Sequence, residues 1–207
     1  MSVNEFAIFD GHNDTLLSLH APARGGGRDF FVESERGHID LPRARRGGFG
    51  GGFFAVFVPN EEQMKRSDTQ SSDKDLIITK DGYEVRMAPS VELPYAQHVA
   101  IAMSARLFRL EAASEGQVKV VRTADELHDC LQNDVLAAIL HFEGAEAIDT
   151  NFDALEVFYQ AGLRSLGIVW SRSNAFGYGV PFKYPTSPDT GPGLTDAGKE
   201  LVRACNR

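Results

Sequence analysis

A histidine and an aspartate stand two residues apart just after the first apolar run of the chain. His12 and Asp14 follow Phe6–Phe9 in the stretch FAIFDGHNDT. An apolar run closed by Gly and Asn/Asp predicts a buried strand over Phe6–Phe9 that ends at a polar surface. Side chains two apart in a strand share a face, so an imidazole nitrogen and a carboxylate oxygen would form half of a metal site. The alternative is that Asp14 or Thr15 caps the helix that begins at Leu16.

A second candidate, Glu143, directly follows an apolar strand predicted over Val135–Phe142. A carboxylate is costly to bury there unless it is paired or binds a cation. If this strand and the first strand end on one rim of a barrel, Glu143 meets His12 and Asp14. Its two oxygens could then bridge two cations, which generate a hydroxide and stabilise the oxyanion of a split amide. The alternative is a solvated loop acid beside Glu146.

The third candidate group lies in RSLGIVWSRSNAFGYG, which covers residues 164–179. Trp170, Arg172 and Asn174 stand at or beyond the end of a strand predicted over Arg164–Trp170. Substrate contacts are expected at such a strand end. The alternative is that Trp170 belongs to the core and Arg172 is a surface charge.

Several other chemistries are excluded by the motifs that the chain lacks. The glycine-rich run Gly47–Gly52 has neither the Lys-Ser/Thr of a phosphate loop nor a correctly spaced GxGxxG, and we expect its glycines to turn the backbone into a strand. There is no GxSxG motif for a serine nucleophile. Cys130 and Cys205 lie in no catalytic or metal-binding spacing, so both are expected to be buried free thiols.

The charge balance and the apolar runs limit the partners of the protein. The chain carries 21 basic and 29 acidic residues, a net charge of −8, which argues against nucleic acid. The first residues show no secretory signal, and the longest apolar runs are too short to span a bilayer. We therefore expect a cytoplasmic protein without a membrane partner.

Apolar strands alternate with helices along most of the chain. Besides the strands named above, we expect strands over Phe53–Val58 and Val118–Val121. The expected helices are Leu16–His20, Pro94 to about Glu115, a Thr123-capped helix to Leu131, Phe152–Gln160 and a Thr195-capped helix to Cys205; Glu61–Lys80 is expected to be a polar loop. This alternation predicts an α/β fold with parallel strands, and polar residues at the strand ends are typical of βα-barrel enzymes.

Together these motifs resemble the renal (membrane) dipeptidase family of zinc metallopeptidases. The matching segments, in order, are FDGHNDT, GGFGGGFFAVFVP, HFEGAEAI, LGIVWSRSNAFGYGVP and GPGLTDAGKELV. The resemblance implies a TIM-like barrel with a binuclear zinc site that hydrolyses dipeptides, and it suggests a homodimer. It also implies that His12 and Asp14 hold one zinc and that Glu143 bridges both zincs as the catalytic residue.

The chain departs from the family pattern in two places. Trp170 stands where many members carry a substrate-contacting histidine. The second zinc also needs two histidines further along the chain, whereas all six histidines lie at or before His141, which we expect to pack beside the site rather than bind metal. We therefore expect residues 1–207 to be the N-terminal portion of a single catalytic barrel domain that holds at most one zinc. The alternatives are a truncated, non-catalytic barrel remnant and an amidohydrolase that acts on small acylated amino acids.

Overall fold

The computed structural model describes residues 6–21, 26–65, 75–187 and 189–207, and its centre is a parallel five-stranded sheet. Strand β1 (Ile8–Asn13) pairs with β2 (Phe49–Val56), and β2 pairs with β6 (Leu136–Phe142). On its other side β6 pairs with β5 (Val118–Val120) through its first residues and with β7 (Leu163–Leu166) through its last. All of these pairs are parallel, so the carboxyl ends of the strands share one edge of the sheet.

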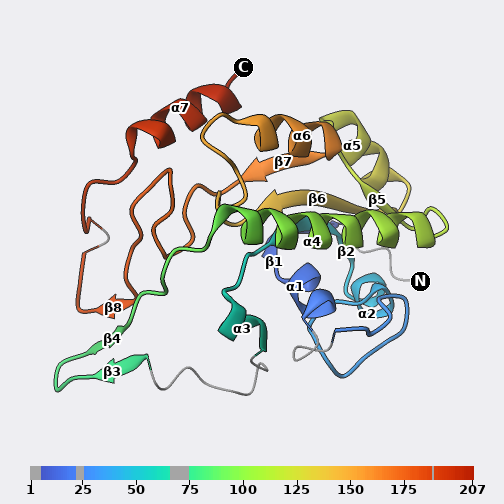
Figure 1. Ribbon diagram of the computed structural model, residues 1–207. Helices are drawn as coiled ribbons and strands as arrows, with labels where there is room; N and C mark the ends of the chain where they lie inside the picture. Colours follow the sequence, from blue (N-terminus) through green and yellow to red (C-terminus); the bar gives the residue numbers. More distant parts are fainter. Residues whose placement is uncertain (1–5, 22–25, 66–74, 188) are drawn as a thin grey trace.

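Helices alternate with these strands along the chain. They are α1 (Thr15–His20), α2 (Leu41–Arg46), α3 (Glu61–Lys65), α4 (Leu93–Ala113), α5 (Ala124–Gln132), α6 (Asp153–Ala161) and α7 (Asp196–Cys205). Figure 1 shows the long α4 lying across the sheet, while the small strands β3, β4 and β8 stand apart from it. The predicted α/β fold with parallel strands is confirmed, and among the described residues the sheet is open.

The core centres on one face of α4. Val99, Met103, Leu107 and Leu110 are buried, as their spacing of three to four residues predicted. Pro94 lies in the first turn of the helix. The helix ends at Ala113, slightly earlier than expected, and the backbone turns left-handed two residues later.

Strand β1 differs from its prediction in position and in burial. It covers Ile8–Asn13 instead of Phe6–Phe9, so the pair Asp10-Gly11 lies inside the strand and forms no turn. Phe6 is 79% exposed and Ile8 57% exposed, so the prediction of a buried strand was wrong. The physical reason is position, because β1 lies at the edge of the sheet, where β2 is its neighbour among the described residues.

Strand β2 begins four residues earlier than the predicted Phe53–Val58, and it includes most of the glycine-rich run. A Cβ atom on Gly51 would lie 2.3 Å from the carbonyl oxygen of Ala137 in β6. One on Gly52 would lie 2.8 Å from the Cβ of Asp10 in β1. Gly51 and Gly52 therefore serve close packing between strands. The predicted turn into the strand lies just before them, at Gly47 and Gly48, where Gly48 has a φ of 69°.

Strand β7 is shorter than the predicted Arg164–Trp170. It ends at Leu166, whose partner Phe142 is the last residue of β6. In the part of the chain that the structure describes, no strand continues beside the residues that follow Leu166. Trp170 consequently lies in a loop and not at the end of a strand.

Two helix starts match the capping motifs that predicted them. The side chain of Thr123 accepts a hydrogen bond from the Glu126 amide at the start of α5, and Thr195 does the same for Gly198 in α7. The Glu126 carboxylate reaches back to the Arg122 amide at 2.6 Å. Both helices therefore begin at the predicted residue.

The predicted polar loop Glu61–Lys80 contains regular structure at both of its ends. It begins with α3 and includes β3 (Leu76–Ile78), while residues 66–74 lie outside the described residues. Strand β3 pairs antiparallel with β4 (Tyr83–Val85), which pairs with β8 (Lys183–Tyr184). This small sheet joins segments about a hundred residues apart.

The two cysteines are free, but they differ in exposure. Cys130 is buried as predicted, whereas Cys205 is exposed at the end of α7, so that prediction was wrong. Leu201 is buried in α7, whereas Cys205 lies in the last turn of this helix, which is exposed to solvent.

Among the helices of the described residues, none has the length and apolarity needed to cross a membrane.

Candidate metal centre

Asn13 fixes the end of β1 between the two candidate ligands. Its side-chain amide donates to the Asp10 carboxylate at 3.0 Å and to the Phe53 carbonyl of β2 at 3.1 Å. Its side-chain oxygen accepts from the Thr15 amide at 3.3 Å. Sequence reasoning missed this role, although an Asn before a helix start is a known signal for such local bonds.

Asp14 precedes α1 at the N-cap position. Its side chain makes no capping hydrogen bond, so the helix does not use this carboxylate. Half of the side chain is exposed to solvent. Of the two alternatives that the sequence left open, capping by the Asp14 side chain is therefore wrong, and its oxygens are available to a ligand.

The backbone of Glu143 is held at the end of β6 by its neighbours. Its amide donates to the Val56 carbonyl at the end of β2, at 3.1 Å. The amide of Ala145, two residues later, donates to the Ile168 carbonyl at 3.1 Å. The residue that carries the third candidate ligand is thus tied to the ends of both β2 and β7.

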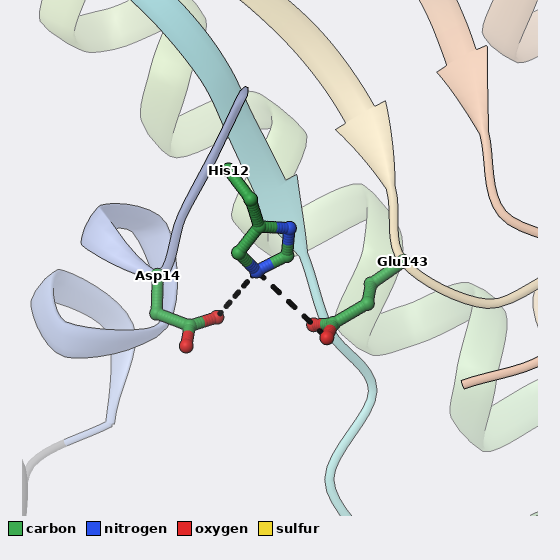
Figure 2. A group of neighbouring side chains, drawn as sticks. All are labelled: His12, Asp14 and Glu143. Atoms are coloured by element: carbon green, nitrogen blue, oxygen red, sulfur yellow. Dashed lines mark ion pairs between the residues drawn. The ribbon is translucent and has the colours of Figure 1, made fainter. Parts of the chain in front are cut away.

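The three candidate side chains converge, as Figure 2 shows. The Nε2 atom of His12 lies 3.8 Å from an oxygen of Asp14 and 3.8 Å from an oxygen of Glu143. One ligand atom from each residue lies within 4.8 Å of the others. Ligands at zinc distances of about 2.0–2.2 Å in a tetrahedron are separated by about 3.4 Å, so small side-chain movements would suffice. The nitrogen and oxygen donors also suit zinc.

The electrostatics of this group favour a cation. Burial, and then the nearby carboxylate of Asp14, raise the pKa of Glu143 to about 6, while His12 acts in the opposite direction. A carboxylate that is only 18% exposed next to another carboxylate is destabilised in its charged form. A bound cation would remove this penalty. The alternative of a well-solvated loop acid is not supported by this burial.

His141 lies against the group without joining it. Its Nδ1 atom is 2.9 Å from the Ser165 hydroxyl, and its ring packs edge-on against His12 with 5.7 Å between ring centroids. Burial, and then the neighbouring His12, lower the pKa of His141, so its neutral form is favoured. These contacts agree with the prediction that His141 packs beside the site.

Trp170 lies at the rim of a cavity and is partly packed into the core. Its ring contacts Phe57 at 4.8 Å and Phe182 at 5.5 Å between centroids. With Met87 and Pro89 it lines a cavity of about 340 Å³. Contact between Trp170 and substrate stays a prediction.

Asn174 organises its own loop. Its side-chain amide donates to the Ile168 carbonyl at 2.7 Å. Its side-chain oxygen accepts from the amides of Phe176 at 2.8 Å and Gly177 at 3.2 Å. The predicted role of Asn174 in binding substrate also stays a prediction, and these bonds already give the side chain a task in the loop.

Arg172 is fully buried, so the alternative of a surface charge was wrong. Its Nε donates to the Glu146 carboxylate at 3.0 Å, and its Nη2 donates to the Val58 carbonyl. Glu146 is itself buried rather than a loop acid in solvent. No sequence signal indicates this pair, because two residues 26 positions apart share no local pattern that would predict their contact.

Comparison with known proteins gives consistent matches. The sequence profile of a family described as membrane dipeptidase, peptidase family M19, matches residues 2–207. A protein of Acinetobacter calcoaceticus, described as an uncharacterized protein in the PQQ-III 3′ region, is 34% identical over 99% of this chain and 62% of its own length.

Two solved structures are similar in both sequence and shape. One is a metallopeptidase from Rhodobacter sphaeroides liganded with a phosphinate mimic of the dipeptide L-Ala-D-Ala. It is 44% identical with a TM-score of 0.85, over 97% of this chain and 56% of that one. The other is dipeptidase AC of family M19, which is 44% identical with a TM-score of 0.83. The match covers 97% of this chain and 55% of that one. This chain thus spans less than two thirds of the length of each of these proteins.

Proposed function

Because this chain belongs to the membrane dipeptidase family, peptidase family M19, we propose that it hydrolyses dipeptides at a zinc site held by His12, Asp14 and Glu143. The observation that carries the proposal is the convergence of one nitrogen and two carboxylate ligands within 4.8 Å of one another. They come from the ends of two parallel strands, which is where enzymes with this type of sheet place their sites.

The proposed roles follow from the positions of the side chains. His12 and Asp14 stand on the β1 side and would hold one zinc from there. Glu143 reaches in from β6, and its second oxygen is free to bridge to another cation. When bound, zinc would supply an activated water and polarise the peptide carbonyl of the substrate. The chain supplies the partly buried position of Glu143, which strengthens its attraction for a cation.

The number of zinc ions is a separate part of the proposal. Within the described residues, one group of His, Cys, Asp and Glu side chains is close enough to hold a metal. We therefore propose one zinc for the residues of this chain. A second zinc would bind only where further ligands join Glu143.

Dipeptides are the proposed substrate class because of the Rhodobacter relative. That structure holds a mimic of L-Ala-D-Ala, and it is 44% identical to this chain. L-Ala-D-Ala is accordingly the first substrate to test. Since the match covers 56% of that chain, the activity of the whole protein remains part of the proposal.

The test compares three glutamine variants with the wild-type protein. Zinc content after dialysis and the rate of L-Ala-D-Ala hydrolysis are measured for each. Glu143→Gln removes the negative charge of a proposed zinc ligand and should lower kcat by several orders of magnitude with an unchanged circular dichroism spectrum. Glu35→Gln, at an exposed glutamate, is the matched control and should have no effect. His141→Gln should have a much smaller effect than Glu143→Gln.

Three outcomes would contradict the proposal. Hydrolysis that survives complete removal of zinc would exclude a metal mechanism. Equal losses for Glu143→Gln and His141→Gln would mean that the ligand is misassigned. Hydrolysis of an N-acylated amino acid in place of the dipeptide would favour the amidohydrolase alternative.

A further inference from the structure

The guanidinium of Arg172 joins three segments that follow strands of the parallel sheet. Arg172 itself lies in the loop after β7. Its Nη2 donates to the carbonyl of Val58, just after β2, and its Nε donates to Glu146, just after β6. Its planar group also lies over the Phe57 ring, 5.6 Å from the centroid. The side chain is completely buried, so solvent does not compete for these contacts.

The Glu146 carboxylate packs directly against the backbone next to Glu143. A Cβ atom on Gly144 would lie 2.1 Å from a carboxylate oxygen of Glu146, so a side chain at position 144 would displace it. A Cβ atom on Gly167 would lie 2.8 Å from the Glu143 carbonyl oxygen. The Glu146 carboxylate and the loop after β7 therefore both lie against the backbone around Glu143.

We propose that the buried Arg172–Glu146 ion pair positions Glu143 for metal binding. The pair fixes the segment after β6 against the segments after β2 and β7, and this fixes the direction in which the Glu143 carboxylate points. Arg172 and Glu146 are positioning residues, because neither is among the side chains that converge as ligands. The metal-binding part of this inference rests on the proposed function.

The energetics of buried ion pairs support a positioning role over a purely stabilising one. The cost of removing two charges from water commonly offsets their attraction, so a buried pair adds little net stability compared with apolar side chains. Arg172 also has a buried Nη1 atom without a hydrogen-bond partner among the described residues. What the pair does supply is directional bonding, because the planar guanidinium bonds to two segments at fixed angles. Groups that orient metal ligands in this way typically change metal affinity about 10–100-fold when removed.

Two variants separate positioning from mere structural support. The double variant Glu146→Met with Arg172→Met replaces the pair by apolar side chains and should keep the fold, since such replacements of buried pairs are tolerated. Arg172→Lys keeps the charge but lacks the planar fork that reaches both segments. The matched control is Glu33→Gln with Arg46→Gln, which removes an exposed ion pair of 2.7 Å.

Zinc affinity, thermal unfolding and amide hydrogen exchange are measured on each protein. The amides of Glu143 and Ala145 report on position without any metal, because they donate to Val56 and Ile168. We expect the double variant to melt within a few degrees of the wild type, with these two amides exchanging at least about tenfold faster and zinc bound at least about tenfold more weakly. Arg172→Lys should also show faster exchange of these two amides and weaker zinc binding. The control variant should have the amide exchange and the zinc affinity of the wild type.

The results that would overturn the inference are distinct from those that would overturn the proposed function. A folded double variant with wild-type exchange at Glu143 and Ala145 and wild-type zinc affinity would show that the pair is only structural. If the double variant does not fold, unchanged exchange and affinity in Arg172→Lys would show the same. If the wild-type protein binds no zinc, the proposed function fails, and the amide exchange still tests whether the pair positions Glu143.

Discussion

Replacing Glu143 by glutamine should stabilise the metal-free protein at high pH. Burial, and then the Asp14 carboxylate, raise the pKa of Glu143 from its ordinary value of 4.5 to about 6. The folded chain therefore binds this proton more tightly than the unfolded chain. The free energy of unfolding is highest where both states are protonated, below about pH 4.5, and it falls until the pH passes about 6.

The size of this effect follows from the difference between the two pKa values. A rise from 4.5 to about 6 corresponds to about 2 kcal/mol of unfolding free energy lost above pH 6. Glutamine is nearly isosteric with the protonated acid and carries no charge at any pH. The free energy of unfolding of Glu143→Gln should therefore exceed that of the wild type by about 2 kcal/mol at pH 8. The two values should be equal near pH 4.

Urea unfolding at several pH values between 4 and 8, with a chelator present, measures this difference. Glu35→Gln is the control, because its exposed side chain should follow the wild type throughout. Excess zinc should reverse the order at pH 8, since the metal binds and stabilises only the folded wild type. A difference that is constant with pH, or a wild type that is more stable than the variant at pH 8 without metal, would refute the reasoning.

Substitutions at three further positions test the fold around the site by urea unfolding. Thr123→Ala removes the cap of α5 and should cost about 1 kcal/mol, whereas Thr123→Ser should cost much less. Leu107→Ala empties a fully buried position on α4 and should cost about 2–5 kcal/mol. Asp40→Asn should destabilise the protein more at pH 7 than at pH 3. Although burial opposes it, hydrogen bonds from Arg43 and Ser34 hold the pKa of Asp40 below its usual value, so its contribution is lost as the pH falls. Equal costs at both pH values would contradict this.

The parts of the fold that depend on local sequence were predictable. Thr123 and Thr195 begin their helices because a hydroxyl cap acts over three residues, and the buried face of α4 follows from its apolar spacing. His12, Asp14 and Glu143 also converge as expected, because parallel strands end at one edge.

Features that depend on contacts between distant segments were missed. The burial of Arg172 and Glu146 is set by three segments that meet only in the folded chain. The early end of β7 depends on where its partner β6 ends, which the sequence of β7 does not contain. The exposure of Phe6 depends on the place of β1 in the sheet, since an apolar run looks the same at an edge and at the centre.

The glycines of β2 also determine how the strands are aligned along their length. Gly51 lies opposite Ala137, and sliding β2 by two residues in either direction would bring Phe49 or Phe53 to that place. The space there is too small even for a methyl group, so both shifted alignments are excluded by steric overlap. Alignment matters at the other end of these strands, because a shift of two residues is about 6–7 Å. Such a shift of β1 and β2 against β6 would carry His12 out of reach of Glu143. The lack of a side chain at Gly51, near the start of β2, thus sets the distance between ligands at the far end of the sheet.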